Sequence, residues 1–125
     1  MIVYHYTTKM NYDQIIASGE IKPSDQNTTM DAAYGAGWYF TDLDTDQCDM
    51  AVMLHCWGKT NVDERITHYL KFEIPETLLH NCRKHVYRVD NWDRTRIKYL
   101  GGGANRVCPK KPCHTCEHGK KMKSA

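Results

Sequence analysis

Tyr-Gly-Ala-Gly-Trp-Tyr-Phe-Thr, residues Tyr34–Thr41, is the stretch that decides how this chain folds. Its two glycines come directly before aromatic and β-branched residues, a pattern that favours a tight turn leading into a strand over Gly37 to Thr41. Glycine also lets the backbone lie close to a ligand, and tyrosine offers a flat face on which a ring can stack. The stretch therefore predicts a strand beside a binding surface.

A first strand is predicted at residues 2–7, where Ile-Val-Tyr-His-Tyr-Thr alternates and is rich in β-branched and aromatic side chains. His5, Tyr6 and Thr7 form a polar cluster at its end. Alternation places His5 and Thr7 on one side and Tyr6 on the other. The gap of roughly thirty residues before Tyr34 is long enough for the chain to fold back and bring the two strands together.

A helix is predicted between these strands. Asn11 is a suitable N-cap, Tyr12, Ile15 and Ile16 share one side, and Gly19 is a C-terminal stop. The residues from Lys22 to Ala33 are mostly polar and predict an exposed loop.

A second helix is predicted from about Asp46 to Trp57, with Asp42 or Asp44 as its cap and Gly58 as its end. Its apolar residues recur at three- and four-residue steps, which is typical of core packing: Met50, Met53, Leu54 and Trp57. Cys48 and Cys56 fall in this region and are expected to be packed thiols.

The remaining elements predict further strands. Residues 66–74 alternate and place His68, Leu70, Phe72 and Ile74 on one side. A helical turn over residues 76–81 and strands over 85–89 and 96–100 follow, and Gly101–Gly103 should end regular structure. Strands with segregated helices predict an α+β fold.

Composition indicates one domain and a basic tail. The chain has 125 residues, of which 41% are hydrophobic and 26% charged, as in a soluble globular domain. Residues 1–103 hold 11 Lys and Arg against 14 Asp and Glu, a net charge of −3, whereas residues 104–125 carry +5. We expect a domain over 1–103 and a basic tail over 104–125 that is a solvated extension or touches phosphates or acidic partners.

The surroundings expected for the chain are intracellular. No signal sequence and no apolar run of about eighteen residues is seen, so export and membrane insertion are not predicted. The six cysteines are then expected to be reduced. The tail holds Cys108, Cys113, His114, Cys116 and His118, which can in principle bind zinc, although a flexible extension is favoured over a metal site.

Four segments together resemble the ADP-ribosyltransferase superfamily: His5-Tyr6-Thr7, Ser18-Gly19-Glu20-Ile21, the run from Tyr34 to Asp42, and Ile97-Lys98-Tyr99-Leu100. The match is to the branch of diphtheria toxin and poly(ADP-ribose) polymerase, and closest to compact HYD-type toxin domains. The resemblance implies a split, strongly bent β-sheet with two or three short helices. It also implies an NAD site in a cleft between the first strand and residues 34–41.

The activity implied by the resemblance is mono-ADP-ribosyl transfer from NAD, with release of nicotinamide and without a metal. The family's first-strand histidine corresponds to His5, which would bind a ribose hydroxyl, and its stacking tyrosine corresponds to Tyr39. Tyr6 occupies the position where the family's backbone groups hold the nicotinamide carboxamide, and Thr7 matches the hydroxyl residue that follows in the family. The rim of the pocket would be shaped by Tyr34, Gly35 and Gly37.

The third catalytic position departs from the family pattern. Ungapped superposition of the polymerase branch places His85 where that branch has glutamate. The resemblance to HYD-type domains implies an aspartate instead. We assign Asp90, with Asp93 and Asp42 as alternatives. The missing glutamate argues against chain elongation and leaves three readings open: mono-ADP-ribosyl transfer, NAD hydrolysis, or a module that binds NAD, ADP-ribose or a protein without reacting.

The acceptor is left open as a protein, a nucleic acid or a small molecule. If the protein is a toxin, we expect delivery into another cell.

Overall fold

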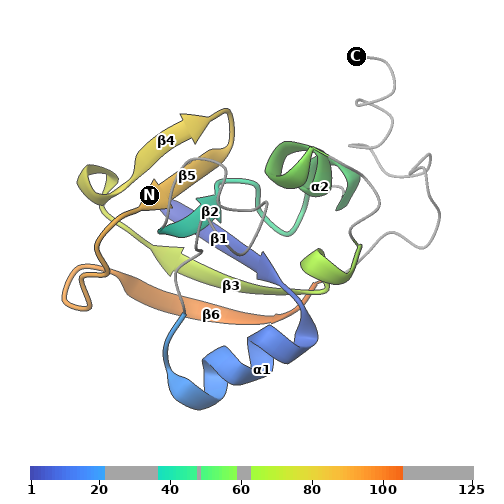
Figure 1. Ribbon diagram of the computed structural model, residues 1–125, viewed down its shortest axis with the longest axis horizontal. Helices are drawn as coiled ribbons and strands as arrows, with labels where there is room; N and C mark the ends of the chain where they lie inside the picture. The colour runs from blue at the N-terminus through green and yellow to red at the C-terminus, as the bar shows by residue number, and fades with distance from the viewer. Residues whose placement is uncertain (22–36, 48, 59–62, 106–125) are drawn as a thin grey trace.

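A six-stranded antiparallel sheet organises the molecule (Figure 1). The computed structural model describes residues 1–21, 37–47, 49–58 and 63–105. Its strands are β1 Ile2–Thr7, β2 Trp38–Thr41, β3 His68–Glu73, β4 His80–Arg83, β5 Val86–Val89 and β6 Lys98–Ala104. They lie in the order β4-β5-β2-β1-β3-β6. Two α-helices fall within the described residues, α1 Lys9–Ser18 and α2 Asp49–Trp57, so the predicted α+β fold is confirmed.

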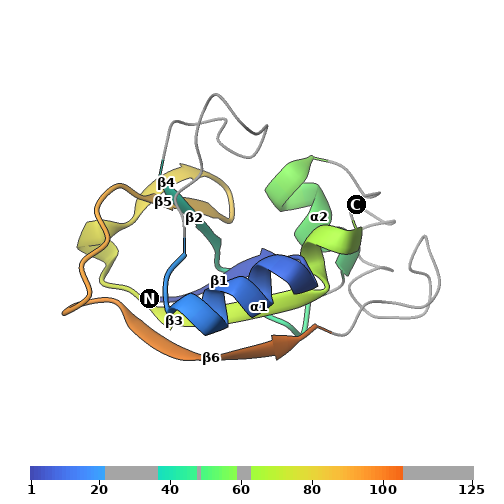
Figure 2. The same ribbon diagram turned by 60° about the horizontal axis from the view of Figure 1, so that its bottom comes forward.

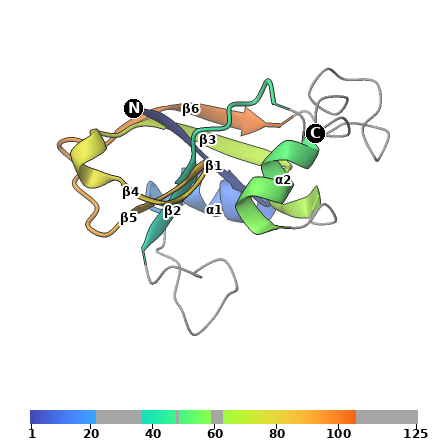
Figure 3. The same ribbon diagram turned by 90° about the horizontal axis from the view of Figure 1, so that it is seen from above.

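The sheet consists of two halves that meet between β1 and β2. β1 pairs with β3 along its whole length, from Ile2 opposite Glu73 to Thr7 opposite His68. By contrast, Tyr4 opposite Thr41 is the one registered pair between β1 and β2 in the described residues. Figure 3 shows β4, β5 and β2 gathered to one side of β1, β3 and β6. The weak seam between the halves is where the polar residues of β1 meet β2.

The core consists of two clusters, because β1 is buried on both faces. The first core cluster lies around Val3 of β1, with Tyr12 and Ile15 of α1 packed against it, and its other members are Phe40, Leu70, Phe72, Ile74, Val89 and Ile97. The second core cluster lies around Tyr4 and Tyr6, with Leu43, Val52, Met53 and Ile66. Figure 2 shows α1 lying along β1 and β3. Alternation along β1 thus separates the two clusters onto opposite faces of the sheet.

The first helix begins earlier than predicted. Thr8, not Asn11, is the N-cap: its backbone is extended, and its Oγ1 accepts a hydrogen bond of 3.1 Å from the Asn11 backbone N–H. The predicted stop is confirmed, because Gly19 has a φ of 73° and its N–H donates to the Ile15 carbonyl at 2.8 Å. Ile16 is 50% exposed, because the side of α1 that contacts the sheet is narrower than the predicted stripe.

The buried side of α2 is rotated from the predicted stripe, of which Met53 and Trp57 pack in or against the second core cluster. Its buried residues are Asp49, Ala51, Val52 and Met53, and Leu54 is 43% exposed. The helix starts at Asp49 rather than Asp46, so Val52, Met53 and Cys56 form the side that packs on the second core cluster. The prediction of a packed thiol at Cys56 is confirmed, and burial raises its pKa to about 11. Cys48 lies outside the described residues.

The C-terminal half contains one strand that the sequence reading missed. The predicted helical turn over 76–81 is limited to the 3₁₀ turn Glu76–Leu78, and His80–Arg83 forms β4. Ile66 belongs to the 3₁₀ turn Asp63–Ile66, so β3 begins only at His68. Leu70, Phe72 and Ile74 are buried on one side as predicted.

The glycines at positions 101–103 continue a strand instead of ending it. β6 runs from Lys98 to Ala104 and pairs with β3 along this glycine run. A Cβ on Gly102 would stand 2.4 Å from the Tyr69 carbonyl oxygen, so only glycine allows this close approach of the two backbones. The prediction that these glycines break regular structure was therefore wrong.

Gly37 sets the entry into β2. Its φ is 151°, and a Cβ there would stand 2.8 Å from the Val89 carbonyl oxygen and 3.0 Å from Cγ of Arg88. Both the backbone angle and the close neighbour exclude a side chain. The glycine therefore allows β2 to lie directly against β5.

Replacing Gly37 by alanine should destabilise the fold. Overpacking against the Val89 carbonyl and a strained φ should together cost about 2 kcal/mol, which lowers Tm by about 10 °C. Gly103→Ala is the matched control, because a Cβ there meets no atom within 4 Å. Equal melting temperatures for the two variants in differential scanning calorimetry would contradict this account of β2.

Removing the cap of α1 should have a smaller effect. Thr8→Ala loses the acceptor for the Asn11 N–H and should lower the free energy of unfolding by about 1 kcal/mol. Thr8→Ser keeps the hydroxyl and should remain near the wild-type value in urea unfolding. If the serine variant is as unstable as the alanine variant, the hydroxyl is not the cap.

Candidate functional site

His5 joins the two halves of the sheet. Its Nδ1 lies 3.1 Å from the carbonyl oxygen of Tyr39, and its ring meets the ring of Phe40 edge-on with centroids 6.0 Å apart. A carbonyl oxygen can only accept, so the proton of this contact is on Nδ1 and the neutral ring carries its lone pair on Nε2. The predicted proximity of His5 and the 34–41 segment is therefore observed, with the imidazole held against the β2 main chain.

The neighbours of His5 in β1 are more deeply buried. Tyr6 is 6% exposed, donates its hydroxyl to the Leu43 carbonyl at 2.8 Å and stacks on Tyr4. Burial raises the pKa of Tyr6, so its phenol stays protonated. Thr7 is also 6% exposed. Of the three predicted residues in β1, His5 alone is more than slightly exposed.

Tyr39 sends its side chain to the other face of β2. Trp38 and Phe40 belong to or pack against the first core cluster, so alternation places the phenol of Tyr39 on the opposite face. Its register partner on β5 is Arg88. The imidazole of His5 thus contacts the carbonyl of Tyr39, and the phenol of Tyr39 lies beside β5.

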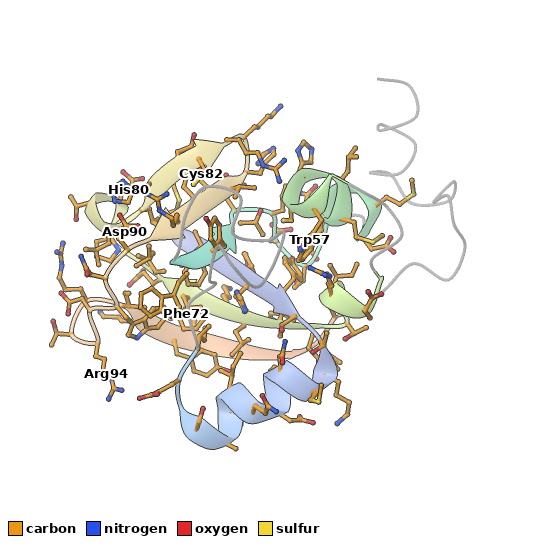
Figure 4. The ribbon with its side chains drawn as sticks, viewed as in Figure 1. Trp57, Phe72, His80, Cys82, Asp90 and Arg94 are labelled. Carbon is orange, nitrogen blue, oxygen red and sulfur yellow. The ribbon has the colours of Figure 1, made fainter. Side chains whose placement is uncertain are left out.

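Asp90 lies on the Tyr39 face, in an ion-pair cluster. Its two carboxylate oxygens contact Arg88 Nε at 2.7 Å and His80 Nε2 at 3.0 Å. Arg88 and His80 are register partners on β5 and β4. Figure 4 shows His80, Cys82 and Asp90 together in this part of the molecule. The carboxylate predicted for catalysis is therefore shared by two basic side chains.

Asp42 lies in a second cluster, at the other end of β5. Its Oδ1 is 2.6 Å from His85 Nδ1, and its Oδ2 accepts a hydrogen bond of 3.2 Å from the Tyr87 hydroxyl. Tyr87 is the register partner of Phe40, so its side chain lies on the face of the sheet on which His5 lies. The ring of His55 in α2 stands edge-on to His85 with centroids 4.7 Å apart.

Burial is the main cause of a lowered pKa at His55, and three nearby side chains lower it further: His85, Lys84 and Arg83. Sequence reasoning missed both His55 and Tyr87. The alternation of His85 and Tyr87 in a strand-like segment was the available signal, but it gave no sign of their shared partner.

Of the other predicted site residues, Asp93 lies in a turn, and several fall outside the described part of the chain. Asp93 closes a turn, because its Oδ1 accepts from the backbone N–H and hydroxyl of Thr95, which lowers the pKa of Asp93. Tyr34 and Gly35 lie outside the described residues, as do the predicted loop at 22–33 and the Cys and His residues of the tail. Among the residues that the structure describes, no group of three His, Cys, Asp or Glu side chains could hold a metal ion.

The match of the chain to a protein family follows from one comparison with known proteins. No helix in the described ranges is both long and apolar enough to cross a membrane. No curated protein and no solved structure matches the chain. A family model described as "HYD1 signature containing ADP-ribosyltransferase" matches residues 3–97, a span that contains β2, β5, both carboxylate clusters and all of β1 except Ile2. The chain therefore belongs to the family of HYD1-signature ADP-ribosyltransferases.

Proposed function

We propose that this protein transfers a single ADP-ribosyl group from NAD to an acceptor and releases nicotinamide. The observation that carries the proposal is the imidazole of His5, held by the Tyr39 carbonyl at the seam between the half-sheets. Membership of an ADP-ribosyltransferase family supports the choice of NAD as the co-substrate. No metal is required, because the positively charged nicotinamide is already a good leaving group.

His5 would orient the ribose next to the nicotinamide. Its Nδ1–H is used by the Tyr39 carbonyl, so the neutral ring can accept a hydrogen bond from a ribose hydroxyl at Nε2. The bond to nicotinamide breaks through a cation-like state at the ribose carbon, and a fixed ribose reaches that state with less loss of entropy. His5 is thus proposed as the residue that fixes the reacting sugar.

Tyr39 would hold the nicotinamide ring. A stacked aromatic pair contributes about 0.5–1.5 kcal/mol beyond burial. The phenol leaves β2 on the side opposite to Phe40, whose ring meets His5, so a ligand that contacts both side chains would have to reach both faces of β2. We keep Tyr6, Thr7, Tyr34, Gly35 and Gly37 as proposed contacts of the same ligand, with the backbone of Tyr6 rather than its buried phenol facing it.

A carboxylate would stabilise the positive charge that develops on the ribose. Phe40, whose ring meets His5, is two residues from Asp42, about 7 Å along an extended chain. Asp90 lies one strand further from β1, beyond β5, and its charge is opposed by Arg88 at 2.7 Å. The geometry therefore favours Asp42, and Asp90 is the alternative.

Removing the His5 imidazole should lower the rate of nicotinamide release. We expect kcat/KM of His5→Ala to fall at least tenfold, about 1.4 kcal/mol of transition-state stabilisation. His68→Ala is the control, because His68 is a half-buried histidine of β3 that contacts Thr67 and Tyr12.

Tyr39→Ala should also lose activity, while Tyr39→Phe, which keeps a ring, should retain most of it. Chromatographic measurement of nicotinamide released from NAD decides the matter, and activity unchanged in His5→Ala would refute the proposed site.

The two carboxylates are separated by substitution with asparagine. Asp42→Asn should reduce nicotinamide release about 100-fold, because the charge beside the His5 face is lost. Asp90→Asn should lose less than Asp42→Asn. The reverse order would assign the role to Asp90.

Labelled NAD identifies the acceptor class. Label retained on a protein, on a nucleic acid or on a small acceptor supports transfer. Free ADP-ribose as the sole product in the presence of candidate acceptors would instead assign NAD hydrolysis. A shift of the melting temperature by NAD without nicotinamide release would assign a binding module.

A further inference from the structure

We propose that His85, positioned by Asp42, is the general base that removes the proton from the acceptor during transfer. The inference rests on the proposed function and adds to it a second group that touches the reactants. Asp42 and His85 are 43 residues apart in the chain, and the fold brings their side chains to 2.6 Å. His85 is the proposed base, and Asp42, which is also the carboxylate proposed to stabilise the ribose cation, positions it.

The hydrogen bonds of the pair fix the direction of proton transfer. A carboxylate accepts, so the contact at 2.6 Å keeps the proton on His85 Nδ1 and leaves Nε2 as the basic nitrogen of the neutral ring. The second oxygen of Asp42 is held by the Tyr87 hydroxyl at 3.2 Å. With both oxygens bonded, the carboxylate has one orientation, and it stabilises the imidazolium that forms when Nε2 accepts a proton.

The backbone of His85 is in a conformation that histidine rarely adopts. Its φ is 67°, and it is the one non-glycine residue with a positive φ among the described residues. Such conformations persist where surrounding contacts hold them, and they are concentrated at functional sites. Here the contacts are the bond to Asp42 and the edge-on ring of His55. The turn before β5 therefore presents the imidazole in a fixed position.

The pair is accessible and lies near the seam. The side chain of His85 is 27% exposed and that of Asp42 33%, so both can meet a ligand while remaining partly shielded from water. Thr41 pairs with Tyr4 of β1 on one side and with Val86 of β5 on the other. Asp42 and His85 are the next residues beyond that row. The base is thus placed directly beyond the point where the two half-sheets join.

The proton and electron balance of the step is complete. The bond between the ribose carbon and the nicotinamide nitrogen breaks, and its electron pair neutralises the pyridinium. An acceptor oxygen forms the new bond to the same carbon, and its proton moves to His85 Nε2. The step thus serves an acceptor whose attacking atom must lose a proton, as in a hydroxyl group or water.

The electrostatic surroundings of His85 come from three elements. Asp42 follows β2, Tyr87 belongs to β5, and His55 belongs to α2. Burial lowers the pKa of His55, and the nearby Lys84 and Arg83 lower it further, so His55 adds no charge at neutral pH. Asp42 is therefore the charged group in direct contact with His85.

The test compares water with azide as the acceptor. Azide already carries a negative charge and has no proton to lose, so its attack on the ribose carbon needs no base. With NAD in buffer, His85→Asn should release nicotinamide about 100-fold more slowly than wild type. Asparagine tolerates a positive φ and cannot act as a base, which makes it the preferred replacement. Added sodium azide should restore release in His85→Asn to within a few-fold of the wild-type rate and form ADP-ribosyl azide.

Three further variants are compared with His85→Asn in the same two assays. Lys84→Gln changes the exposed neighbour of His85 in the same turn and should behave as wild type in both arms. His5→Ala should be slow in both arms, because azide cannot replace a residue that binds the ribose. Asp42→Asn should stay slow with azide, because azide replaces the base but not the carboxylate proposed to stabilise the ribose cation. Melting temperatures measured alongside show whether each variant is folded.

The outcomes separate the two proposals. If wild type releases no nicotinamide in either arm, the proposed function fails and the base fails with it. If wild type is active and His85→Asn matches it in water, the transferase remains and the base is refuted. A folded His85→Asn that is slow in water and equally slow in azide also refutes the base, because the side chain then serves binding.

Discussion

The hydrogen bond from His5 Nδ1 to the Tyr39 carbonyl is the contact on which the arrangement of the site depends. In the part of the chain that the structure describes, Tyr4 with Thr41 is the one registered pair between the half-sheets, and the His5 imidazole makes a further contact between β1 and β2. The positions of the other proposed site residues depend on how β1 and β2 meet at this seam. Gly37 allows β2 to lie against β5, β5 carries the residues on both of its faces, and the core clusters on the two sides of β1 keep that strand in place.

The four residues of β5 separate two chemically different clusters. At one end Asp90 is balanced by Arg88 and His80, and at the other Asp42 is bonded to His85 and Tyr87. His85 and Asp90 are about 16 Å apart along the strand, so they cannot act on one ribose carbon. The choice between the clusters therefore decides where the bond to nicotinamide lies relative to the sheet. The face shared by His5 and Tyr87 supports the end that carries Asp42.

Local sequence patterns predicted the strands well, but they predicted poorly which side chains contact one another. β1 and β2 follow from β-branched and aromatic residues, and the family resemblance carried by these two segments agrees with the family match over residues 3–97. The cap at Thr8 and the phase of α2 were missed, since both depend on how the helix meets the sheet. The glycines of β6 were misread because the need for a close backbone at Gly102 is visible only beside Tyr69. The pairing of Asp42 with His85 joins distant segments, and no spacing rule predicts it.

The bond of His5 has a consequence for the behaviour of the protein in an acidic compartment. An imidazole that takes up a second proton keeps the hydrogen already on Nδ1, so the contact with the Tyr39 carbonyl survives protonation. What changes is Nε2, which turns from an acceptor into a donor. Acidification would then leave the joint between the half-sheets intact while reversing the polarity of the nitrogen that a ligand meets. In His5, therefore, Nδ1 serves the contact between the strands, and Nε2 serves the ligand.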